Sequence, residues 1–190
     1  MTQTTPQAER LARRPLPGDL GTEAQLRRVI RVDQAGEYGA ARIYAGQLSV
    51  LGKTPIGPTI RHMEEQEQVH LDTFNQLMVE RRVRPTALQP LWKVLGYALG
   101  AGTALMGERA AMACTVAVEE VIDAHYAAQA ERLGPGEADL KATIEKFRAE
   151  EVEHRDIGIA NEAELTTGYP VLYTLIKAGT RAVIWVAERI

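Results

Sequence analysis

The feature that most restricts how this chain can fold is a pattern of glutamates and histidines that occurs twice in its 190 residues. In each half, one glutamate stands about 30 positions before a Glu-x-x-His motif. Residues three apart lie on the same face of an α-helix, so each motif can present both side chains to a common ion. The repeat therefore predicts one helix-pair design used twice. The residues concerned are Glu37, Glu67 and His70 in the first half and Glu119, Glu151 and His154 in the second.

Apolar residues around these motifs recur at intervals of three and four, as on the buried side of a helix. The spacing predicts a first helix from about Thr22 and a second helix after a turn at residues 51–55. A third helix is predicted with Leu105 on its inner face, ending near Leu133 at a Gly-Pro-Gly sequence, and a fourth from about Ala138. We therefore expect an all-α fold in which both motifs face the core of a four-helix bundle.

Carboxylates on these inner faces need a positive partner, because an unpaired buried charge costs several kcal/mol. Lysine and arginine are absent from the predicted inner positions, which makes metal ions the simplest partner. A helix rises about 1.5 Å per residue, so Glu37 and Glu67 come to nearly the same height in their hairpin. One glutamate from each of two helices, with Glu-x-x-His from each of the other two, is the arrangement of ferritin-like di-metal proteins. Carboxylate and imidazole ligands without cysteine favour iron or manganese over structural zinc.

The rest of the chain adds segments to this bundle. Residues 91–105 are apolar and interrupted by glycine, and we interpret them as part of a crossover; residues 170–190 predict an additional C-terminal helix. Residues 1–21 contain prolines and glycines and predict a flexible arm, which leaves residues 22–190 as a single ferritin-like domain. The longest uncharged stretch, residues 94–107, is shorter than the ~20 residues that a membrane-spanning helix needs.

Composition excludes several classes of protein. A net charge of −3 and a pI near 5.9 argue against a nucleic-acid partner. The single cysteine, Cys114, cannot form an intramolecular disulfide, which favours a reducing compartment. The N-terminus lacks the apolar core of a secretory signal, although removal of an organelle targeting peptide stays open.

Acids next to the motifs divide into inner and outer ones, because adjacent helical residues point about 100° apart. Asp33 and Glu150 are either acceptors for ligand N–H groups or surface residues, and the sequence leaves both interpretations open. Tyr126 shares a face with Glu119 and either borders the site or packs in the core. The acids expected at the surface are Glu64, Glu65, Glu120 and Glu153.

Four segments are more specific than the motifs alone: residues 33–40 (DQAGEYGA), 43–47 (IYAGQ), 113–120 (ACTVAVEE) and 150–158 (EEVEHRDIG). They resemble the demethoxyubiquinone hydroxylase family of ubiquinone biosynthesis, and the likeness covers roughly residues 28–190. The resemblance implies that the six glutamates and histidines bind two iron ions, with Glu67 and Glu151 bridging them. No further catalytic residue is expected.

The resemblance also implies an activity and a location. A demethoxylated ubiquinone precursor would be hydroxylated on its ring with O₂ and electrons ultimately from NADH, although the chain carries no Gly-x-Gly-x-x-Gly fingerprint for that cofactor. The polyprenyl tail of such a substrate places it in a membrane, so we expect peripheral binding to the membrane surface. That surface is the cytoplasmic side of a bacterial inner membrane, or the matrix side of the mitochondrial one if a targeting peptide was removed. Other ubiquinone-biosynthesis proteins and further copies of the chain are candidate partners.

Two alternatives use the same residues differently. A ferritin-like iron store would oxidise iron without altering a quinone, but the apolar residues 91–105 and 170–190 do not suit the polar shell of a hollow cage. A helical interaction module with a vestigial site would bind little or no metal.

Overall fold

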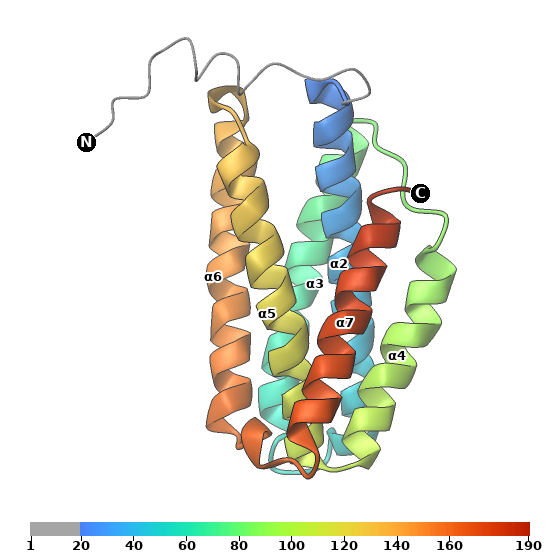
Figure 1. The fold of residues 1–190 in the computed structure, drawn as a ribbon, viewed down its shortest axis with the longest axis vertical. Coiled ribbons are helices and arrows are strands. Elements are labelled where there is room, and N and C mark those ends of the chain that lie inside the picture. The colour runs from blue at the N-terminus through green and yellow to red at the C-terminus, as the bar shows by residue number, and fades with distance from the viewer. Residues whose placement is uncertain (1–19) are drawn as a thin grey trace, which may run out of the picture.

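The structure is a computed structural model that describes residues 20–190, and all its regular elements are helical, as predicted (Figure 1). The predicted flexible arm, residues 1–21, lies outside the described part of the chain except for its last two residues. Two short 3₁₀ turns, η1 and η2, precede the fifth and sixth of the major helices. The major helices are α2 (Thr22–Leu51), α3 (Gly57–Glu80), α4 (Gln89–Leu105), α5 (Glu108–Arg132), α6 (Ala138–Ala160) and α7 (Tyr169–Ala187); η1 is Pro135–Glu137 and η2 is Ala163–Leu165.

Four helices, α2, α3, α5 and α6, form the bundle that the repeat predicts. The chain turns sharply between α2 and α3 and between α5 and α6, so each pair is an antiparallel hairpin (Figure 1). Between the hairpins, the irregular residues 81–88 and α4 together carry the chain back along the bundle, and α5 therefore runs in the same direction as α3 (Figure 1). The predicted crossover and the additional C-terminal helix are both confirmed.

Glycines let α4 lie unusually close to α2. A Cβ atom on Gly100 would stand 1.9 Å from the carbonyl oxygen of Ile43, and one on Gly46 would stand 2.3 Å from that of Tyr97. Two of the glycines that interrupt this segment, Gly96 and Gly100, therefore face α2. Pro90 lies in the first turn of α4, where proline loses no helical hydrogen bond.

The predicted position of Leu105 is wrong. It ends α4 and is 76% exposed instead of facing the core from the third helix. Gly107, with φ of 114°, separates the two helices, and α5 begins at the next residue. The apolar periodicity of the sequence continues across Gly107, but the helix does not, and for this reason the sequence placed Leu105 in the wrong helix.

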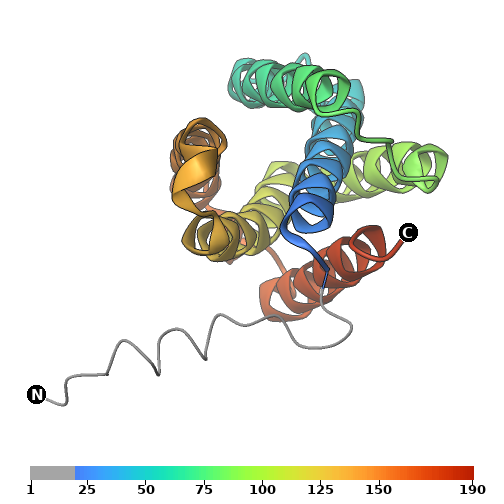
Figure 2. The same cartoon turned by 90° about the horizontal axis from the view of Figure 1, so that it is seen from above.

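Apolar clusters occupy both ends of the bundle. One includes Ile60 and Met63 near the α2–α3 turn, and the other includes Phe74 and Phe147 towards the opposite end. Along α3, Glu67 and His70 fall between these clusters. The charged layer is thus enclosed by apolar side chains above and below. Helix α7 lies against α2 and α5, on the side of the bundle away from α3 and α6 (Figure 2).

Candidate metal centre

The structure gathers all six predicted glutamates and histidines in the middle of the bundle. Each side chain is at most 3% exposed, so the predicted inward orientation of the stripes is confirmed. The ligand-type atoms form two groups, within each of which all lie within 4.8 Å of one another. Glu67 and Glu151 belong to both groups. The first group adds Glu37 and His70 to them, and the second adds Glu119 and His154.

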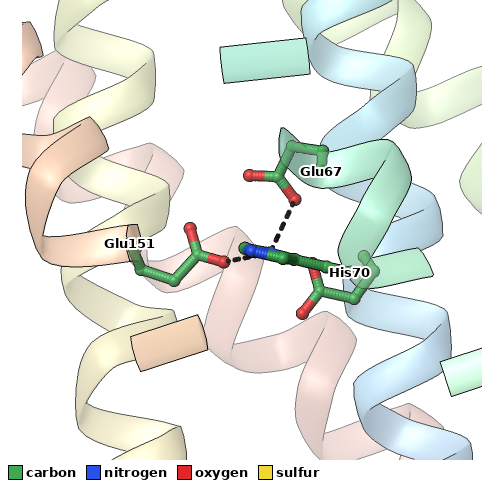
Figure 3. Close-up of side chains that lie close together, drawn as sticks. Glu67, His70 and Glu151 are labelled. Carbon is green, nitrogen blue, oxygen red and sulfur yellow. Dashed lines mark ion pairs between the residues drawn. The ribbon is translucent and has the colours of Figure 1, made fainter. Parts of the chain in front are cut away.

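Glu67 and Glu151 each aim one carboxylate oxygen at each histidine. Glu151 Oε1 lies 3.1 Å from Nδ1 of His70, and Oε2 lies 3.3 Å from Nδ1 of His154. Glu67 Oε2 lies 3.9 Å from His70 Nδ1, and its Oε1 lies 3.2 Å from His154 Nδ1. Figure 3 shows Glu67 from α3 and Glu151 from α6 converging on the ring of His70. Both carboxylates therefore lie between the two histidines and belong to both groups.

The two outer glutamates are each held by a tyrosine from the opposite hairpin. Tyr44 on α2 donates a hydrogen bond of 2.8 Å to Oε1 of Glu119 on α5. Tyr126 on α5 donates one to Oε1 of Glu37 on α2, so Tyr126 borders the site instead of only filling the core. The sequence analysis did not single out Tyr44 for this role. The signal was present, because each tyrosine stands two helical turns after the glutamate of its own helix.

The outer nitrogen of each histidine is also held across the bundle. The partners of Nε2 are a carboxylate oxygen and an amide oxygen, which only accept, so Nε2 of each histidine carries a proton and donates it. Nε2 of His70 donates to Oε2 of Glu150 at 2.7 Å, which decides the open question about Glu150 in favour of an acceptor. Nε2 of His154 donates to Oε1 of Gln66 at 2.9 Å. The sequence analysis did not single out Gln66.

The other neighbouring acids do not reach the ligands. Asp33 is 2% exposed and its Oδ1 accepts a hydrogen bond of 2.7 Å from Gln129, so neither of its predicted roles is correct. Glu65 and Glu153 are exposed as predicted, Glu64 is half-buried, and Glu120 is half-buried in an ion pair with Lys177 on α7.

A small cavity of about 20 Å³ opens beside the centre and is lined by residues of α2, α5, α6 and α7. Asp33, Glu37, Glu119 and Glu151 contribute to its polar wall. Its apolar wall is formed by Val32, Ala40, Ile122 and Ile184, among other side chains.

The donor atoms at the centre fit a metal site. Both carboxylate oxygens of Glu67 and of Glu151, one of Glu119, and Nδ1 of both histidines are buried without a hydrogen-bond partner. Buried polar atoms are normally satisfied, because leaving one unsatisfied costs about 1–3 kcal/mol. Cations among them would accept these lone pairs, and no lysine or arginine among the described residues is buried there to do so.

Ionisation of the cluster shows the same need for positive charge. Burial raises the pKa of Glu67 well above its ordinary value, and the charges of Glu151 and Glu37 raise it further. Burial also raises the pKa of Glu119. For His70, burial lowers the pKa, but contacts with Glu151, Glu37 and Glu67 outweigh burial and raise it to about 12. Without metal, protons must supply the charge that divalent ions would otherwise supply.

Comparisons with known proteins show the family of this chain. The family described as "Ubiquinone biosynthesis protein COQ7" matches residues 24–187. A "3-demethoxyubiquinol 3-hydroxylase" of Rhodospirillum rubrum is 59% identical over 176 residues, which cover 92% of this chain and 83% of the relative. The human "NADPH-dependent 3-demethoxyubiquinone 3-hydroxylase, mitochondrial" is 56% identical, covering 89% of this chain and 80% of the relative. A yeast "5-demethoxyubiquinone hydroxylase, mitochondrial" is 47% identical, covering 88% and 79%. The resemblance found in the sequence is therefore confirmed, and the chain belongs to the COQ7 family of ubiquinone biosynthesis proteins.

Proposed function

We propose that this protein is a di-iron monooxygenase that hydroxylates the quinone ring of a demethoxylated ubiquinone precursor. The names of its relatives describe this reaction. The observation that carries the proposal is the pair of overlapping carboxylate and histidine groups that share Glu67 and Glu151. Four carboxylates balance the charge of two divalent ions, which a bundle core could not otherwise accommodate.

Each residue of the centre has a specific task. Glu37 and His70 would hold one iron, Glu119 and His154 the other, and Glu67 and Glu151 would bridge them. When bound, the iron pair supplies electrons to O₂ for insertion of one oxygen atom into the ring.

The residues around the ligands keep the site fixed and dry. The tyrosines from the opposite hairpins hold the outer carboxylates in place, and the apolar clusters at both ends of the bundle exclude water. Apolar side chains of α2, α5 and α7 beside the small cavity would orient the ring. No catalytic residue beyond the metal ligands is required.

The polyprenyl tail of the substrate is apolar, and α4 and α7 are the helices whose surfaces suit it. Among the described residues, no helix is both long and apolar enough to cross a membrane. Exposed apolar side chains nevertheless lie along both helices, and Lys93 is the only charged residue of α4. We expect these helices to bind the membrane surface peripherally and to admit the tail. The exposed apolar residues are Leu91, Val94, Leu95 and Leu105 on α4 and Val171, Leu175 and Trp185 on α7.

The side of the membrane follows from the reducing compartment that the sequence predicts. It is the cytoplasmic side of a bacterial inner membrane, or the matrix side of the mitochondrial inner membrane. Other ubiquinone-biosynthesis proteins and a second copy of the chain are the partners we expect there.

The activity is tested by loading the protein with iron anaerobically and adding ¹⁸O₂ with a demethoxylated quinone. The expected product is heavier by one ¹⁸O atom, as measured by mass spectrometry. An iron store would oxidise iron and return the quinone unchanged. Glu151→Ala should abolish both iron binding and product, whereas Glu153→Gln, an exposed carboxylate on the same helix, should leave both intact. Turnover by Glu151→Ala would contradict the proposed centre.

The electron source is tested separately. We expect NADH to support turnover, while the human relative is named for NADPH. Rates measured with each nucleotide at equal concentration, with and without quinone, decide between them. Faster turnover with NADPH would refute our expectation without affecting the metal centre.

A further inference from the structure

The residue that accepts the hydrogen bond from each histidine Nε2 stands next to the Glu-x-x-His motif of the other hairpin. Glu150 directly precedes Glu151 on α6, but it supports His70 on α3. Gln66 directly precedes the equivalent glutamate of α3, and it supports His154 on α6. The two positions are equivalent in the repeat, yet one carries a carboxylate and the other a neutral amide.

The rest of the two ion positions is closely matched. Each has one outer glutamate, one histidine and the same two bridging carboxylates. Each outer glutamate accepts a hydrogen bond from a tyrosine. The partner of the histidine Nε2 is therefore the clearest chemical difference close to the ligands.

Glu150 is well placed to act on His70. Its Oε2 lies 2.7 Å from the ring, and its side chain is only 25% exposed. Lys146 reaches the other oxygen at 3.6 Å, but Lys146 is 62% exposed and water screens its charge. Phe147 stacks on His70 with ring centroids 4.0 Å apart and fixes the plane of the imidazole. A carboxylate that accepts the N–H of a ligand histidine makes the opposite nitrogen a stronger donor to metal.

We propose that Glu150 is a positioning residue that makes the ion position at His70 bind divalent metal more tightly than the position at His154, where Gln66 takes its place. The inference rests on the metal centre proposed above but does not depend on the hydroxylation. Exchange of an outer partner of this kind typically changes metal affinity by about 10–100-fold.

The experiment is an anaerobic titration of the full chain with cobalt(II), followed by its absorption. The wild type should bind two ions in separate steps, with dissociation constants about tenfold or more apart. Glu150→Gln should weaken the first step by about tenfold and merge the two steps. Gln66→Glu should strengthen the second step, so that both ions bind with about the affinity of the first wild-type step. The double exchange, Gln66→Glu with Glu150→Gln, should restore two steps with the order of the positions reversed.

The order is read from the cobalt-shifted Nε2–H proton signals. The signal of His70 is assigned through its contact with Phe147, and that of His154 through Tyr44, whose ring lies edge-on at 6.0 Å. The His70 signal should appear first in the wild type and second in the double exchange. Glu153→Gln, which removes an exposed carboxylate from the same helix, should change neither step.

Three outcomes would overturn the inference. Two cobalt ions that bind the wild type with equal affinity would refute it while leaving the metal centre intact. An unchanged order in the double exchange would do the same. A wild-type chain that binds no cobalt would refute the metal centre, and this inference with it. Because Gln66→Glu strengthens a site, the test stands even if Glu150→Gln folds poorly.

Discussion

Tyr126 on α5 donates a hydrogen bond across the bundle to the buried carboxylate of Glu37 on α2. Tyr126→Phe removes the donor and leaves Glu37 Oε1 without a partner in the core. We expect the free energy of unfolding of the metal-free protein to fall by about 1–3 kcal/mol, as measured by urea denaturation. Tyr97→Phe, on a tyrosine exposed on α4, is the control and should have little effect. Equal stability of Tyr126→Phe and the wild type would show that the hydrogen bond contributes nothing.

The outer and bridging glutamates should differ in iron stoichiometry. Glu37→Ala removes a ligand from one ion position only, so we expect about one iron per chain after anaerobic loading. Glu119→Ala should give the same number through the other position. Glu151 serves both positions, and Glu151→Ala should bind almost none. Metal analysis of the loaded proteins measures this, and two irons retained by Glu37→Ala would contradict its assignment.

The ion pair between Glu120 and Lys177 ties α7 to α5, with a distance of 2.5 Å. Burial tends to raise the pKa of Glu120, but hydrogen bonds from Lys177 and Tyr173 outweigh burial and lower it. A lowered carboxyl pKa contributes stability that is present above the ordinary value of 4.5 and is lost as pH falls through the folded-state pKa. Glu120→Gln should therefore destabilise the protein by about 1 kcal/mol at neutral pH, and this difference should shrink progressively in acid.

Urea denaturation at several pH values measures the effect of Glu120→Gln. Glu145→Gln, in an exposed pair with Lys141, is the matched control and should change stability little at any pH. A loss of stability in Glu120→Gln that is the same at all pH values would show that charge is not the cause.

The contact of α4 with α2 predicts opposite effects for two alanine substitutions in one helix. Gly100→Ala would force a Cβ atom to 1.9 Å from the carbonyl oxygen of Ile43, so we expect a loss of about 3 kcal/mol or more. Gly102→Ala meets no atom within 4 Å and should stabilise the helix by about 0.5–1 kcal/mol. Thermal unfolding of both variants is the measurement. A stable Gly100→Ala would mean that the two backbones are not in close contact.

Membrane binding should depend on α4 and α7 and not on exposed apolar residues in general. Val94→Glu and Leu175→Glu each place a charge on the exposed faces of these helices, and we expect liposome binding to weaken about tenfold or more for each. Val79→Glu alters an exposed valine on α3 and should leave binding unchanged. Cosedimentation with vesicles measures the partitioning. Equal losses in all three variants would argue against a specific membrane face.

The sequence was sufficient for the bundle and the inward-facing residues because both follow from helical periodicity, which neighbouring helices do not alter. Glu67 and His70 share a helical face whatever surrounds them. The roles of Tyr44 and Gln66 depend instead on how two helices are rotated relative to each other, and periodicity carries no information about that. The partner of Asp33 was missed for the same reason, since Gln129, whose amide donates to Oδ1 of Asp33, lies on another helix.

The long crossover between the hairpins determines where the tyrosines lie. Residues 81–88 and α4 together return the chain along the bundle, so that α2 and α5 run in opposite directions (Figure 1). Tyr44 and Tyr126 each stand about 10 Å along the axis beyond the glutamate of their own helix. Because the two helices run in opposite directions, each tyrosine can reach the glutamate of the other helix. Had a short loop made these helices parallel, both tyrosines would be displaced the same way, and at most one of the two bonds could form.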